Sequence, residues 1–133
     1  MAESFQILSR DDHSSLRLEA HDRNYFIADL RGLNLGARAR VGTYMSGGLA
    51  ELFGELAADW RGWDGQKAWR SLEGELQLTA TADRAGHVTL LTRLREGAPP
   101  LWSVELTLVV EAGQLEQIAR EARAFELAVL SAT

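Results

Sequence analysis

Cysteine is absent from this chain of 133 residues, which excludes a disulfide framework, a thiolate nucleophile and a zinc site with sulfur ligands. The absence favours a reducing compartment, so we expect a cytoplasmic protein. Long apolar runs are also missing, because none approaches the ~20 residues that span a bilayer. The N-terminal residues lack the basic and apolar segments of a secretion signal. We therefore expect no membrane partner.

Clustered positive charge is missing as well. The basic side chains are thirteen arginines and Lys67, and the net charge is −5. Basic and acidic residues number seven and ten in residues 1–66, and seven and nine in residues 67–133. Nucleic-acid binding usually needs a concentrated basic surface, because phosphate neutralisation supplies most of the affinity. We expect no nucleic-acid partner.

Local catalytic patterns are absent too, since the chain has no Gly-x-Ser-x-Gly and no His-Glu-x-x-His motif. His13, His21 and His87 fall at expected turns or strand ends, and none has a second histidine at helical i, i+4 spacing. Asp11-Asp12-His13 is a poor metal triplet, because consecutive residues of an extended chain point to opposite sides. We expect no catalytic residue, no metal and no cofactor.

Two further signals favour structural interpretations. Residues 43–48 place glycines before a predicted helix, but they match neither the phosphate-loop pattern nor the dinucleotide fingerprint. Helix capping therefore explains them better than anion binding. Glu73 and Glu75 share a strand face, and a buried carboxylate pair could serve acid–base chemistry. A solvated face is the favoured interpretation.

Alternating apolar and polar residues predict strands with one buried face. In the first half, residues 14–20 and 33–41 alternate, and residues 5–9 could add a short strand. Residues 25–30 are also strand-like, but either Phe26, Ala28 and Leu30 or Tyr25 and Ile27 could face the core.

The second half alternates more regularly. Residues 73–81 and 87–95 form a hairpin with a turn at residues 83–86, and residues 102–110 follow as a third antiparallel strand. The side chains expected on the helix-covered face of these strands are Leu76, Leu78, Val88, Leu90, Trp102, Val104, Leu106 and Leu108.

Two segments change to the helical period. Apolar residues between Leu49 and Trp60 predict a helix that Ser46 caps and Gly62 terminates. A C-terminal helix follows from the stripe of Leu115, Ile118, Ala119, Ala122, Phe125 and Val129.

Strands therefore come in blocks, which favours the α+β class. We expect one domain, residues 1–133, with an antiparallel sheet of about six to seven strands and two amphipathic helices. The order is three or four strands, a helix, three strands and a helix. The halves could be duplicated βββα units, although no residue-level repeat supports duplication.

The most unusual segment, residues 60–69, holds three of the four tryptophans and the single lysine. Its indoles and cations could form a stacking platform for a ligand or a partner, or they could close the core. The candidate binding residues are Trp60, Arg61, Trp63, Lys67 and Trp69.

Leu127 and Leu130 lie off the main stripe of the C-terminal helix, so its last turns are apolar over more of the circumference than one sheet requires. The strands at residues 31–41 and 101–110 could also present open edges. We therefore expect a homodimer, with Leu127 and Leu130 or one of these edges in the contact.

The stretch from Trp60 to Phe125 resembles a family of short bacterial proteins known only as a domain of unknown function. The resemblance is carried by Trp-Arg-Gly-Trp-Asp-Gly, Lys-Ala-Trp, Ser-Leu-Glu, Gly-His-Val, Trp102, Gly-Gln-Leu, Ile-Ala and Phe125. It implies a bacterial cytosolic protein and transfers no catalytic residue.

The leading hypothesis is a non-catalytic protein-interaction module, with a class-level analogy to immunity proteins that neutralise a toxin. The alternative is a small-molecule-binding protein or enzyme with a pocket between the sheet and the helices.

Overall fold

The computed structural model of the chain describes residues 4–11, 13–43, 48–97 and 99–131. In these residues each half of the chain has four strands followed by an α-helix. Each half therefore has one strand more than the βββα unit considered above. The first half comprises β1 (Ser4–Leu8), β2 (Ser15–Ala20), β3 (Tyr25–Gly32), β4 (Leu35–Gly42) and α1 (Leu49–Ala58). The second comprises β5 (Lys67–Arg70), β6 (Leu76–Ala82), β7 (His87–Glu96), β8 (Trp102–Glu111), a 3₁₀ turn (Ala112–Gln114) and α2 (Leu115–Ser131).

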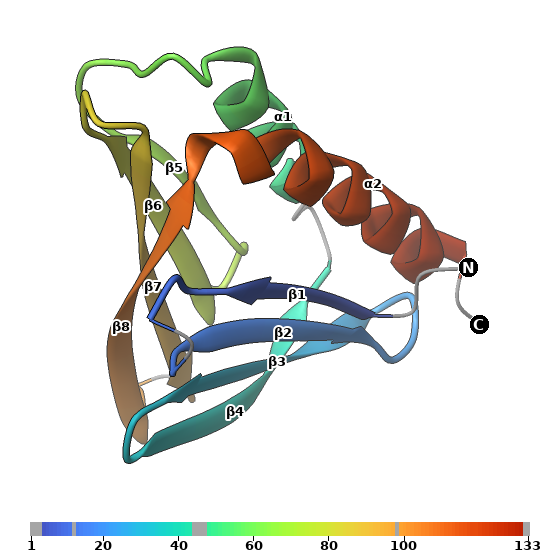
Figure 1. Cartoon of the computed structure of the whole chain (residues 1–133). Helices are drawn as coiled ribbons and strands as arrows, with labels where there is room; N and C mark the ends of the chain where they lie inside the picture. Colours follow the sequence, from blue (N-terminus) through green and yellow to red (C-terminus); the bar gives the residue numbers. More distant parts are fainter. Residues whose placement is uncertain (1–3, 12, 44–47, 98, 132–133) are drawn as a thin grey trace.

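The strands form two antiparallel sheets of four, in the orders β1-β2-β3-β4 and β5-β6-β7-β8. Figure 1 shows the C-terminal sheet standing at a steep angle to the N-terminal sheet, with α1 and α2 closing the open side between them. The core fills the space that the sheets and helices enclose. The α+β class is confirmed.

The single sheet of six to seven strands is a prediction that the structure corrects. The strand β5 was not predicted, because its four residues are too few for a clear alternation. The separation of β4 from β5 depends on long-range packing, since α1 lies between them in the chain.

Glu75 helps to join the sheets, because its carboxylate accepts hydrogen bonds from Gly42 N at 3.1 Å and from Ser71 Oγ at 2.6 Å. Glu75 is thus half-buried and partnered, whereas Glu73 is exposed, so the expected solvated face holds for Glu73 alone.

The register predicted for the second half is confirmed. Leu76, Leu78, Val88, Leu90 and Leu108 are buried. The other three predicted residues are partly buried against the same core, namely Trp102, Val104 and Leu106.

In the first half, the side chains of β3 that face the core are Phe26, Ala28 and Leu30, which are all buried. This settles which of the two faces of β3 is turned inward. Leu33 departs from the expected alternation, because it lies with Asn34 in the connection between β3 and β4 and is 72% exposed. Asn34 has a φ of 64°, so the chain reverses here.

The helix α1 ends at Ala58, earlier than the apolar stripe predicts. Trp60 therefore lies beyond the helix instead of on its buried face. Gly48 occupies the N-cap position, and the predicted cap Ser46 lies outside the described residues. Gly62 follows in the left-handed region with a φ of 116°. Neither described helix is long and apolar enough to cross a bilayer.

The helix α2 buries the predicted stripe, except that Ala119 is only partly buried, and it packs its aromatic residue in the core. The Phe125 ring lies edge-on to Phe26, with centroids 5.5 Å apart, and 6.3 Å from Phe5. Phe53 of α1 extends the cluster, with its centroid 5.6 Å from that of Phe5. These rings join both helices to the N-terminal sheet.

Candidate functional site

The predicted tryptophan platform divides into an outer and an inner part. Trp60 is 54% exposed, and the Arg61 guanidinium lies 5.1 Å above its ring. This pair is the part that reaches solvent. Arg61 also lines a surface hollow of about 310 Å³ together with Trp63 and Arg84.

The inner part packs against the core. Trp63 and Trp69 are partly buried, and the Lys67 ammonium lies 5.7 Å from the Trp63 ring and 2.9 Å from an oxygen of Asp59. The Trp63 indole nitrogen is buried without a hydrogen-bond acceptor among the described residues. Trp63, Lys67 and Trp69 thus hold the loop in place, which leaves Trp60 and Arg61 as surface candidates.

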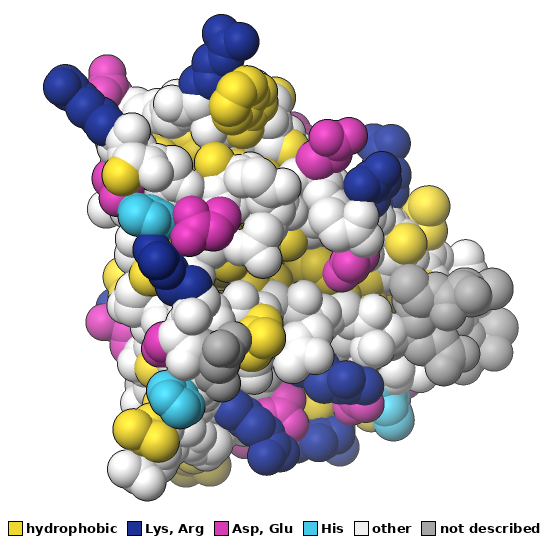
Figure 2. Space-filling view, viewed as in Figure 1, with side chains coloured by type: hydrophobic (Ala, Val, Ile, Leu, Met, Phe, Trp, Pro, Cys, Tyr) yellow, Lys and Arg dark blue, Asp and Glu magenta, His cyan; other side chains and the backbone are white. Residues whose placement is uncertain are grey.

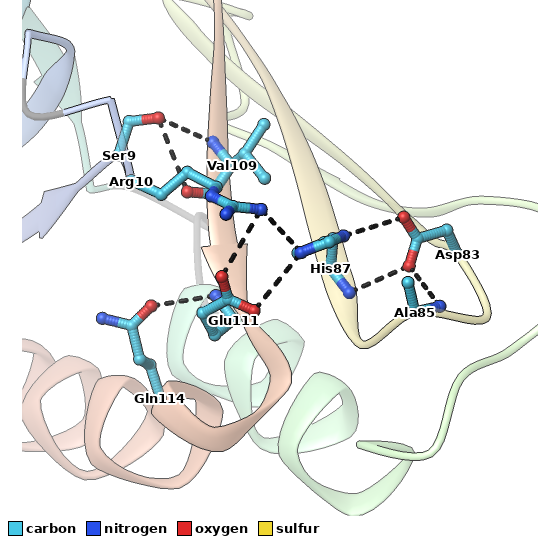
Figure 3. Close-up of polar contacts among 8 residues, drawn as sticks. All are labelled: Ser9, Arg10, Asp83, Ala85, His87, Val109, Glu111 and Gln114. Atoms are coloured by element: carbon cyan, nitrogen blue, oxygen red, sulfur yellow. Dashed lines mark hydrogen bonds and ion pairs between the residues drawn. The ribbon is translucent and has the colours of Figure 1, made fainter.

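A polar cluster that the sequence analysis did not foresee joins the β1–β2 connection, the β6–β7 hairpin and the end of β8 (Figure 3). His87 lies at its centre, with Nδ1 3.1 Å from Asp83 Oδ2 and Nε2 2.6 Å from Arg10 Nη1. Glu111 lies 3.5 Å from both Arg10 and His87. Three chain segments far apart in sequence therefore meet in one network.

An Asp–His pair of this kind can orient a general base when the second ring nitrogen faces a substrate. Here the Arg10 guanidinium and the Glu111 carboxylate lie at that nitrogen, where a substrate would have to bind. Beside it, Ser9 Oγ accepts from Val109 N at 2.9 Å, and Arg10 N donates to Val109 O at 2.9 Å. The arrangement fits a structural clasp between the two sheets better than a catalytic dyad.

This clasp also protects one of the edges that the sequence analysis considered for dimer contact. Because Ser9 and Arg10 bond both polar groups of Val109, the C-terminal part of β8 is not open to another strand. The edge strand β4 pairs with β3 alone among the described strands. Its outward side chains include Arg38 and Arg40, and such charges disfavour pairing with a second copy.

A groove between the helices is the second feature that the sequence analysis missed. Its volume is about 560 Å³, and its floor along α1 carries the small residues Ala50, Gly54 and Ala58. Leu127 of α2 lines the opposite wall. The i, i+4, i+8 spacing of the small residues is visible in the sequence, but it does not show that a neighbouring helix leaves this face open.

The charged groups around the groove are unequally partnered. Glu126 of α2 accepts a hydrogen bond from Ala50 N at 2.8 Å and so caps the N-terminus of α1. Glu51 and Glu55 on α1 and Arg123 on α2 line the groove and form no ion pair with the described residues.

The two leucines predicted for a dimer contact are both on the surface. Leu127 is 60% exposed and Leu130 is 58% exposed. Leu127 lines the groove, and Leu130, three residues further along α2, lines a separate hollow beside Leu49. No group of three or more potential metal ligands is present in the described part of the chain.

A family model described as a family of unknown function (DUF6228) matches residues 7–128, so the chain belongs to this family. The resemblance found in the sequence is thereby confirmed, while the bacterial origin stays a prediction. No curated protein and no solved structure matches the chain.

Proposed function

We propose that this member of the family is a non-catalytic protein-interaction module that pairs with a second copy through the α1–α2 groove. The observation that carries the proposal is the combination of two exposed leucines with unpaired charges of opposite sign on the groove's two walls. Leu127 and Leu130 expose apolar surface that a partner would remove from water.

The charges make this face self-complementary. The α1 wall carries Glu51 and Glu55, and the α2 wall carries Arg123, while Glu126 on that wall is engaged by Ala50 N. In a two-fold dimer every contact occurs twice, so the acidic α1 wall of each copy can meet Arg123 of the other. Leu127 then enters the partner's groove, where the missing side chain of Gly54 leaves open space.

The alternative, an enzyme or small-molecule-binding protein, needs a pocket between the sheets and helices. Buried side chains from both sheets and both helices occupy that space, including Phe5, Leu56, Leu90 and Phe125. The 560 Å³ groove lies instead on the outer side of the helices, beside exposed Glu51 and Gly54. This placement favours a macromolecular partner over a ligand enclosed in the core.

Light scattering combined with size exclusion tests the proposal at micromolar concentration. The unmodified chain should have twice the 14.7 kDa mass of one copy, and Leu127→Glu should reduce it to the single mass. The matched control is Leu101→Glu, because Leu101 is 83% exposed in the β7–β8 connection. Dissociation by both variants, or by neither, would count against the groove as the contact. A monomer in every sample would remove self-association and leave only a different protein as partner.

A further inference from the structure

The outward face of the N-terminal sheet collects arginines that are dispersed in the sequence. Register places Arg17, Asp29 and Arg38 in one row across β2, β3 and β4. Arg31 and Arg40 lie on the same face in neighbouring rows. The helices cover the opposite face of this sheet, so this face is open to solvent (Figure 1). Figure 2 shows basic and acidic side chains side by side along this lower surface.

The face has an excess of positive charge in a chain whose net charge is −5. It has four arginines, Arg17, Arg31, Arg38 and Arg40, and its described carboxylates are Glu19 and Asp29. The arginines therefore exceed the carboxylates by two. Local charge of this kind attracts an anionic partner at short range even when the whole chain is acidic.

Two of these arginines are only loosely paired. Arg17 and Arg38 share Glu19, at nitrogen–oxygen distances of 3.5 and 3.4 Å, and Arg38 lies 3.7 Å from Asp29. A well-formed contact between guanidinium and carboxylate is about 2.7–2.9 Å long. By contrast, Arg31 binds Asp29 at 3.0 Å. Most N–H donors of Arg17 and Arg38 are thus available to another acceptor.

Surface hollows lie on both sides of this loosely paired group. One has a volume of about 310 Å³ and extends toward His21 and Ile27. The other has a volume of about 300 Å³ and extends toward Arg31. Arg17, Glu19 and Arg38 line both. An acceptor seated in either hollow can therefore reach two guanidinium groups.

A stack of planar groups borders the face. His21 and Tyr25 stack with centroids 4.7 Å apart, and the Arg40 guanidinium lies 4.9 Å above the Tyr25 ring. Tyr and Arg are enriched where proteins bind one another, since they provide large contact area and directional donors.

We propose that this arginine face binds an acidic segment of a partner protein, whose carboxylates bridge Arg17 and Arg38 in place of Glu19. An arginine fork matches a carboxylate in bidentate geometry, which the long contacts to Glu19 do not achieve. The surface is separate from the helical groove, so it can act in the monomer and in the dimer.

The carboxylates that lie among these arginines favour a protein segment over a nucleic acid as the partner. Glu19 and Asp29 lie within the face and would repel a continuous row of phosphates, which cannot move aside independently. Separate carboxylates on a protein segment can instead contact the two arginines and avoid Asp29.

Fluorescence anisotropy with a labelled oligoglutamate peptide provides the test, with a labelled oligothymidylate as the competing probe. The variant Arg17→Gln/Arg38→Gln should weaken oligoglutamate binding about tenfold or more, because it removes two charged hydrogen-bond donors from the contact. The control Arg70→Gln/Arg84→Gln removes the same charge from the other sheet and should leave the affinity within about twofold. Near-ultraviolet circular dichroism checks that both variants are folded.

A second readout locates the contact. On addition of oligoglutamate, the Nε–Hε resonances of Arg17 and Arg38 should shift in NMR spectra, and those of Arg70 and Arg84 should not. Undetectable oligoglutamate binding, or an equal loss in the control variant, would overturn the proposal. Tighter binding of oligothymidylate would overturn it in favour of a nucleic-acid surface.

Discussion

Replacing Phe125 by alanine tests whether α2 anchors the core. The Phe125 side chain is 1% exposed and contacts aromatic rings from β1 and β3, so the replacement removes buried surface and leaves a cavity. Buried Phe→Ala changes cost about 3–5 kcal/mol, and an aromatic pair adds about 0.5–1.5 kcal/mol beyond burial. We expect the free energy of unfolding to fall by about 3–5 kcal/mol.

Urea unfolding followed by tryptophan fluorescence measures this loss, since the chain has four tryptophans. Phe125→Leu keeps most of the volume and should lose less than Phe125→Ala. Gln117 lies on the exposed side of the same helix, so the control Gln117→Ala should change the free energy of unfolding by less than about 0.5 kcal/mol. A loss below about 1 kcal/mol in Phe125→Ala would refute the assigned helix face.

Two further predictions concern the contacts that hold the sheets and turns. Glu75→Ala should lower the free energy of unfolding by about 2 kcal/mol in urea titrations, because Gly42 N and Ser71 Oγ lose a charged acceptor; an unchanged value would show that this tie is dispensable. Backbone N–H groups of His13 and His87 donate to Asp11 and Asp83, respectively, and so lower the pKa of each carboxyl group from its usual value. The two ionised carboxylates therefore stabilise the folded state fully at pH values above their unfolded pKa, and this stabilisation is lost as the pH falls through their folded pKa. The midpoint temperature of thermal unfolding should decrease when the pH is lowered below about 4. Asp83→Asn should flatten that fall, and a curve identical to the unmodified chain would contradict the assignment.

The buried faces of individual strands and helices could be predicted, because each depends on the spacing of apolar residues within a short segment. The alternation around Leu78 and Leu90 fixes which face is buried, whatever the neighbouring sheet does. The break into two sheets could not be predicted, since it depends on contacts such as Glu75 with Gly42, which are 33 residues apart. Likewise, Leu33 fits the alternation by residue type, but the chain reversal at Asn34 places it in solvent.

The candidate surfaces were harder to predict for a related reason. Arg17 and Arg38 are far apart in sequence, and only the β2–β3–β4 register brings them to one row. The tryptophan segment was conspicuous by composition, but residue types do not show that Trp63 packs inward while Trp60 stays exposed. Leu127 and Leu130 lie off the buried stripe, as helical periodicity predicts, and their place in a dimer contact stays a prediction.

Mixing two charge-reversed chains tests self-association through the groove most directly. Glu55→Arg and Arg123→Glu should each be monomeric, because a two-fold dimer of either would face like charges twice. A one-to-one mixture restores both opposite-charge contacts in a heterodimer. Light scattering should then give 14.7 kDa for each variant alone and twice that mass for the mixture. A mixture that remains at 14.7 kDa would contradict the proposed contact.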